Sequence, residues 1–207
     1  FLIGEKEVMR ITKDVLMKYQ PFYETELSLN DNFKFYAISK SDLYNHFSET
    51  NFGQSFQKYK LCWRIHCLDK EFHILGISDS EHLKELKFTD NKDLWLYDEI
   101  ENQNYEVNSL TTGLFTPHEL GYHVTPRVDF EKGCYTGQEI VARMHYRAKK
   151  LPELLIKVSK GGADPLSDVI DSDGKKIGKV LLRAKKGDSN CHLLSMSKNY
   201  SGQDFDL

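Results

Sequence analysis

The pattern of apolar and polar residues predicts several amphipathic helices along the chain. Between residues 5 and 19 the apolar side chains recur every three to four positions, which places them on one face of a helix that ends before Pro21. The apolar residues with this spacing are Val8, Ile11, Val15, Leu16 and Tyr19. Capping residues and apolar spacing predict further helices over 42–48, 79–87, 90–100 and 137–148.

Other segments show the alternation or the short apolar runs that are typical of β-strands. These segments are 32–38, 60–67, 71–77, 151–159, 176–184 and 190–197. Residues 102–130 contain several glycines and prolines and are predicted to be irregular. The mixture of helices and strands predicts an α+β fold. The closely spaced strands after residue 151 predict a small antiparallel β-barrel or sandwich over 151–207.

Composition and charge narrow the class of protein. The chain has 207 residues, of which 40% are hydrophobic and 29% charged, as in an ordinary soluble globular protein. No apolar run approaches the roughly 20 residues that span a bilayer, so we expect no membrane partner. The net charge of -3 is unevenly distributed, because residues 132–198 carry 14 Lys and Arg against 7 Asp and Glu. This basic region is either a docking surface for a polyanion or the solvated surface of the C-terminal β-domain.

The four cysteines form no C-x-x-C pair and no dense disulfide framework. We therefore predict reduced thiols in the cytoplasm, with Cys62, Cys67 and Cys191 as small core residues. The chain does not begin with Met and opens on the apolar triplet Phe1-Leu2-Ile3, so we expect that further residues precede it.

Cys134 stands out because it directly precedes a predicted helix. Thr136 and Glu139 have the T-x-x-E spacing of a capping box, which would begin the helix. The positive end of the helix dipole and the nearby Lys132 would favour a reactive thiolate. A buried structural cysteine at a helix start is equally compatible with these residues.

A Cys–His hydrolase would need a histidine base. His118, His123 and His145 are candidates, but the sequence does not place them against the thiol. The sequence contains no P-loop, G-x-G-x-x-G, H-E-x-x-H or metal-ligand cluster, so no metal site is predicted.

The segment around Cys134 resembles the signature K-G-C-[YF]-x-G-Q-E-x-x-x-R of the YgfZ family of folate-binding proteins, which are relatives of the glycine-cleavage T protein. The matching residues are Lys132, Gly133, Cys134, Tyr135, Gly137, Gln138, Glu139 and Arg143. Residues 113–117 resemble the family's short G-x-F-x-P segment, and 128–130 resemble the strand that leads into the signature.

The resemblance implies ferredoxin-like α/β sandwich domains of the aminomethyltransferase folate-binding type, followed by the small C-terminal antiparallel β-barrel. It implies a folate-binding region over 1–130 that lacks its N-terminal segment, the signature and its helix over 131–150, and the barrel over 151–207. Within 95–101, Trp95 would lie against the folate and Glu101 would bind the pterin. The Arg-Gly that follows this segment in the family is replaced here by Asn102 and Gln103.

By the same resemblance, the protein is a cytoplasmic monomer that binds tetrahydrofolate or another folate. It would support iron–sulfur cluster assembly or repair in client proteins, and thereby tRNA modification, with Cys134 as its reactive thiol. This implies an accessory or regulatory protein rather than an aminomethyltransferase, and leaves open whether any turnover occurs.

Two alternatives remain from the sequence. The first is a tetrahydrofolate-dependent aminomethyltransferase, although the cysteine signature argues against it. The second is a nucleic-acid-binding module that contacts tRNA through its basic C-terminal third, where Arg143, Arg147, Lys149 and Lys150 lie.

Overall fold

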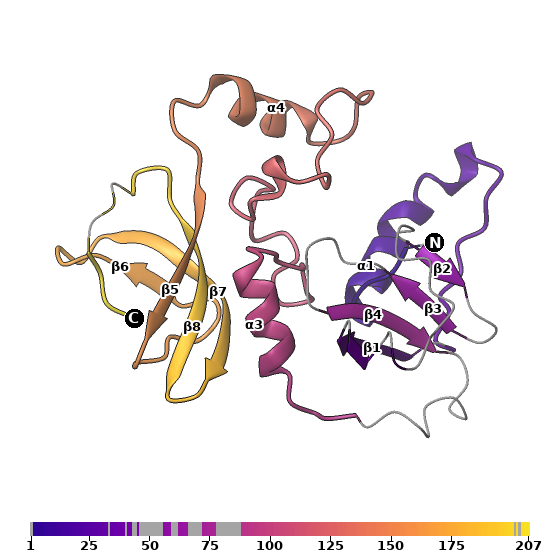
Figure 1. The fold of residues 1–207 in the computed structure, drawn as a ribbon. Coiled ribbons are helices and arrows are strands. Elements are labelled where there is room, and N and C mark those ends of the chain that lie inside the picture. Colours follow the sequence, from indigo (N-terminus) through magenta and orange to yellow (C-terminus); the bar gives the residue numbers. More distant parts are fainter. Residues whose placement is uncertain are drawn as a thin grey trace. The chain divides into compact units, whose positions relative to one another are not determined.

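The computed structural model shows two compact units (Figure 1). It describes residues 2–32, 34–39, 41–42, 45, 56–58, 62–65, 72–77, 88–200, 202 and 204–207, and for the strands between residues 56 and 77 it describes the backbone. The first unit contains residues 1–98 and 108–110, and the second contains 99–107 and 111–207. The domain boundaries at residues 130 and 150 stay predictions.

The first unit contains a four-stranded antiparallel sheet in the order β1-β4-β3-β2. The strands are β1 (Lys34–Ser39), β2 (Phe56–Lys58), β3 (Cys62–Ile65) and β4 (Phe72–Ile77). Three of them confirm the strands predicted over 32–38, 60–67 and 71–77, while the three-residue β2 was not foreseen. The helix predicted over 79–87 lies outside the described residues, and the one over 42–48 lies mostly outside them.

Helix α1 (Lys6–Met17) confirms the amphipathic helix predicted near the start of the chain, and the short 3-10 helix η1 (Gln20–Phe22) follows it. Its apolar side chains are not buried within the described part of this unit, since Ile11 and Val15 are 41% and 48% exposed. The apolar spacing therefore predicted the helix correctly, but it did not predict burial.

Helix α3 (Asp93–Glu101) begins where the sequence suggested. The side-chain oxygen of Asn91 accepts a hydrogen bond from the Asp93 backbone N–H at 3.0 Å, which satisfies one of the free donors at the helix start. The last three residues of α3 belong to the second unit, and Ile100 among them is fully buried.

The second unit contains another four-stranded antiparallel sheet, in the order β5-β8-β7-β6. Its strands are β5 (Glu153–Ser159), β6 (Asp168–Ile170), β7 (Lys176–Lys186) and β8 (Ser189–Met196). Gly187 begins the two-residue turn between β7 and β8, and its φ of 60° is an angle that glycine adopts without strain. The α+β prediction is confirmed at this level, while the aminomethyltransferase-type domains and the barrel stay predictions.

The core of the C-terminal sheet is built from alternating apolar residues of β6, β7 and β8 together with the chain end. Its buried members are Val169, Ile177, Val180, Leu194, Met196 and Phe205. Cys191 is 3% exposed, which confirms it as a small core residue. The side chains of Cys62 and Cys67 lie outside the described part of the chain.

Residues 102–130 are mostly turns, as predicted, with the short 3-10 helix η3 (Tyr122–Val124). Helix α4 (Gln138–Arg147) follows them and confirms the helix predicted over 137–148. Among the described residues, no helix is long and apolar enough to cross a membrane.

Candidate functional site

The signature residues lie in the loop 132–137 and in the first turns of α4. The residue immediately before the helix is Gly137, whose φ of 90° is left-handed, and no side chain caps the helix there. The capping box predicted for Thr136 and Glu139 was therefore wrong. With Gly137 as the capping residue, Glu139 is the second helical residue, whereas a capping box needs a glutamate at the third.

Cys134 is exposed and makes no disulfide. This excludes the alternative of a buried structural cysteine. The Nζ of Lys132 lies 4.6 Å from the centre of the Tyr135 ring, so a cation–π contact holds this ammonium group beside the cysteine's neighbour in the chain. The thiol is thus accessible from solvent on a loop that carries a positive charge, and its reactivity stays a prediction.

The three candidate histidines gather into one cluster with Phe130 and Tyr146. The rings of His118 and His123 stack with centroids 4.9 Å apart, and those of Phe130 and His145 stack at 3.7 Å. The rings of His118 and His145 are 6.4 Å apart. Among the described residues, no hydrogen bond joins Cys134 to any of these histidines. The cluster therefore attaches α4 to residues 118–130, and these described histidines offer Cys134 no base.

The histidine cluster has one fully buried member, His118, and is poor in hydrogen bonds. His118 is 0% exposed, and neither of its ring nitrogens has a hydrogen-bond partner in the described part of the chain. Burial lowers the pKa of His118, and the neighbouring His123 and His145 lower it further. Burial and His145 likewise lower the pKa of His123. The described residues contain no group of three or more His, Cys, Asp or Glu side chains arranged to hold a metal ion.

A capping-box pair of hydrogen bonds does form, but at residues 116–119. The backbone N–H and the hydroxyl of Thr116 donate to Glu119 Oε2 at 2.7 and 2.8 Å. The Glu119 N–H in turn donates to Thr116 Oγ1 at 3.4 Å. This T-P-H-E turn contains His118 and fixes its backbone, and the T-x-x-E spacing at 116–119 is the sequence signal that could have predicted it.

A second cluster connects the segment after α3 to residues 122–127. Arg127 pairs with the Glu106 carboxylate, donates to Asn104 Oδ1 at 2.9 Å and lies 4.9 Å from the centre of the Tyr122 ring. The Tyr122 hydroxyl donates to the Tyr105 backbone oxygen at 2.7 Å. Burial raises the pKa of Tyr122 to about 12, so the phenol keeps its proton and remains a donor at neutral pH.

The predicted folate residues Trp95 and Glu101 both lie on α3. The indole is partly buried and the carboxylate is exposed. They are six positions apart, which on an α-helix corresponds to about 120° around the axis and about 9 Å along it. Helix α3 alone therefore does not direct the two side chains to one ligand, and their roles stay predictions.

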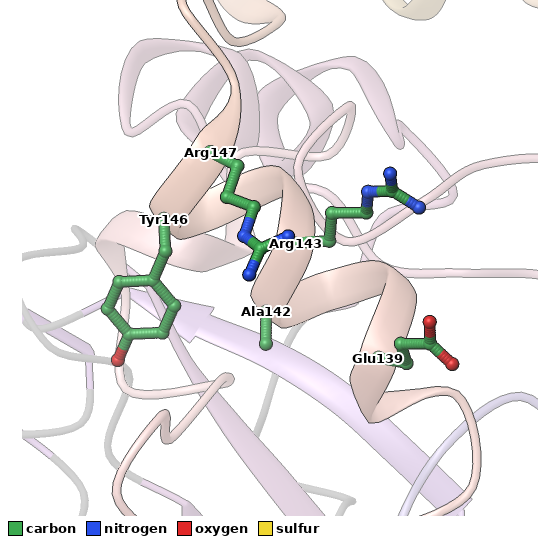
Figure 2. A pocket seen from close by; sticks show the side chains of 5 residues that line it. All are labelled: Glu139, Ala142, Arg143, Tyr146 and Arg147. Atoms are coloured by element: carbon green, nitrogen blue, oxygen red, sulfur yellow. The ribbon is translucent and has the colours of Figure 1, made fainter.

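The outward face of α4 carries a shallow pocket lined by side chains of this helix (Figure 2). The lining residues are Glu139, Ala142, Arg143, Tyr146 and Arg147. Their spacing of three and four positions is that of a single helix face. The sequence identified the basic residues of this region but did not place Tyr146 among them.

No family model matches the chain. Three curated proteins named tRNA-modifying protein YgfZ are similar to it. The protein from Buchnera aphidicola subsp. Schizaphis graminum is 26% identical over 79% of this chain and 55% of its own length. The one from Buchnera aphidicola subsp. Acyrthosiphon pisum is 30% identical over 45% of this chain and 31% of its own length. The one from Vibrio atlanticus is 38% identical over 36% of this chain and 23% of its own length.

The chain thus spans about half, or less, of the length of these relatives. The similarity extends over most of the chain in the longest match. It agrees with the resemblance seen in the signature residues 132–143, and together the two findings support membership of the YgfZ family.

Proposed function

We propose that the protein is a tetrahydrofolate-binding factor that supports iron–sulfur cluster assembly or repair and thereby tRNA modification. The names of the relatives support the part in tRNA modification. The observation that carries the proposal is the position of Cys134, a free and exposed thiol in the loop before α4. A client protein can reach such a thiol without any unfolding of this chain.

The surroundings of the thiol fit a site for a macromolecular client. Cys134 lies three residues before Gly137. In the described chain neither Lys132 nor Glu139 forms an ion pair, so each keeps its charge near the thiol. Because the His118 cluster attaches the following helix to residues 118–130, the loop starts from a fixed support. The thiol is thus exposed to a client, on a loop that is anchored at one end by α4.

The residues proposed for folate fit that ligand only in part. An indole can pack against a flat pterin ring, and the half-buried Trp95 retains accessible surface for such a contact. A carboxylate can accept two parallel N–H bonds from the pterin edge, and Glu101 is exposed. Because about 120° of helix rotation separates the two, a folate site around Trp95 needs polar groups from other segments.

Tryptophan fluorescence tests the folate proposal directly. The chain has two tryptophans, Trp63 and Trp95, so Trp63→Phe and Trp95→Phe form a matched pair. Tetrahydrofolate should quench the emission of the wild type and of Trp63→Phe, and should leave Trp95→Phe nearly unchanged. The absence of quenching in the wild type, or an equal response of both variants, would remove Trp95 from the folate site.

Complementation tests the part in tRNA modification. A bacterium that lacks its own YgfZ protein is supplied with this protein, and its modified tRNA nucleosides are measured by mass spectrometry. We expect Cys134→Ala to lose the restored modification, and the neighbouring exposed Thr136→Ala to keep it. Equal restoration by both variants would show that the thiol is dispensable, and no restoration by the wild type would contradict the proposed function.

A further inference from the structure

The outward face of α4 combines two cations with an aromatic ring. Arg143 lies three positions before Tyr146 and four before Arg147, so the three share one side of the helix. Figure 2 shows their side chains projecting from α4, with the Tyr146 ring extended away from the helix axis. Between residues 138 and 150, four Lys and Arg stand against the single acidic residue Glu139.

The two arginines of this face differ from the other arginines whose side chains are described. Arg10, Arg127 and Arg183 each form an ion pair with a carboxylate, at Glu7, Glu106 and Asp164. Within the described chain, the side chains of Arg143 and Arg147 form no hydrogen bond and no ion pair. Their guanidinium groups therefore remain available to an anion from outside the chain, and a phosphodiester offers the oxygens that guanidinium binds best.

Tyr146 supplies a flat surface beside these cations. Its side chain is 68% exposed, although its ring packs against Phe130 and His145 with centroids 6.1 and 4.8 Å away. Those contacts hold the ring in place while most of its surface stays open to solvent. A fixed, exposed aromatic ring is the element on which unpaired nucleic-acid bases stack.

We propose that this face of α4 binds a single-stranded segment of RNA, with Arg143 and Arg147 contacting phosphates and Tyr146 stacking on an unpaired base. The proposal rests on the proposed function and names the part of a tRNA that the protein contacts, namely an unpaired loop or end. A duplex is a poorer ligand, because its bases are already stacked and offer no free face to Tyr146. A flat anionic membrane would engage the arginines but gives the tyrosine no partner ring.

The test measures binding of a fluorescein-labelled single-stranded 12-mer RNA by anisotropy at several salt concentrations. Tyr146→Ala should weaken binding by about 5- to 150-fold, the range expected for one stacked base. The double variant Arg143→Gln/Arg147→Gln should lower the slope of log affinity against log salt by about 1.4, since about 0.7 counterions are released per phosphate contact on a single strand. Arg183→Gln is the matched control and should bind like the wild type, because that arginine pairs with Asp164.

Three outcomes would overturn the proposal. The first is wild-type affinity and salt slope in both α4 variants, and the second is equal affinity for a duplex of the same length. The third is that the wild type binds phosphatidylserine vesicles but does not bind RNA, and that the two α4 variants lose the vesicle binding. Circular dichroism spectra establish that each variant is folded. Binding of RNA is measured apart from tRNA modification in cells, so a failure here is distinguishable from a failure of the proposed function.

Discussion

Mild acid should destabilise the second unit through its buried histidines. Burial lowers the pKa of both His118 and His123, so the folded protein keeps these rings neutral at a pH where the unfolded chain takes up protons. Their contribution to stability is therefore complete above the unfolded histidine pKa of about 6.5 and is lost as the pH falls below it. His192 adds to this loss, because its buried ring also has a lowered pKa.

The geometry gives the size of the effect. Two imidazolium rings with centroids 4.9 Å apart repel each other by about 3 kcal/mol at an effective dielectric constant of about 20. The folded state therefore resists protonation of both His118 and His123. Each histidine that is protonated only in the unfolded chain lowers the free energy of unfolding by up to about 1.4 kcal/mol for each pH unit. The stacked pair accounts for up to about 2.7 kcal/mol for each pH unit below the unfolded pKa.

Urea unfolding, followed by circular dichroism between pH 7.5 and 5.5, measures this slope. His123→Phe keeps a ring against His118 but removes one titrating group, so its slope should be smaller by up to about 1.4 kcal/mol for each pH unit. His118 and His192 are present in both proteins and provide the slope that remains. Parallel slopes in the wild type and His123→Phe would refute the reasoning, because the stack would then not govern the pH dependence.

Three further predictions concern local contacts. Arg127→Ala should lower the free energy of unfolding by about 1–2 kcal/mol in urea, because it removes an ion pair and a cation–π contact, and a loss below about 0.3 kcal/mol would contradict this. Thr116→Ala should lower the free energy of unfolding by about 1 kcal/mol and Thr136→Ala by less than about 0.5 kcal/mol, since only Thr116 makes the reciprocal hydrogen bonds. Equal losses in the two variants would count against that assignment. A maleimide should label Cys134 in the native protein and Cys191 only after unfolding, because only Cys134 is exposed. Peptide mass spectrometry measures the labelling, and labelling of both cysteines in the native protein would disprove the burial of Cys191.

The regular elements were predictable where a single periodic pattern governs the backbone. The spacing of apolar residues located α1 and α4, and alternation located β1 and β7. The short strands β2 and β6 were missed, because three residues are too few to show a period. Burial on α1 was also not predictable, since spacing defines an apolar face but not what covers it.

The site was less predictable, because its contacts join segments that are distant in sequence. The two T-x-x-E motifs at 116–119 and 136–139 look equivalent in the sequence, yet only the first forms the reciprocal hydrogen bonds. The left-handed Gly137 moves the helix start by one residue in the second. The gathering of His118 with His145 depends on how residues 118–130 fold back on α4, and no local pattern encodes that.

The two faces of α4 link the pH dependence of the histidine cluster to the proposed RNA binding. Its inner side holds His145 within the histidine cluster, and its outer side presents Arg143 and Arg147. Tyr146 touches both, because its ring packs against His145 while most of its surface faces solvent. Protonation of His118 and His123 would loosen the packing that supports that ring without changing the charge of the arginines. If RNA stacks on Tyr146, mild acid should therefore weaken the stacking part of the affinity while the salt slope stays constant.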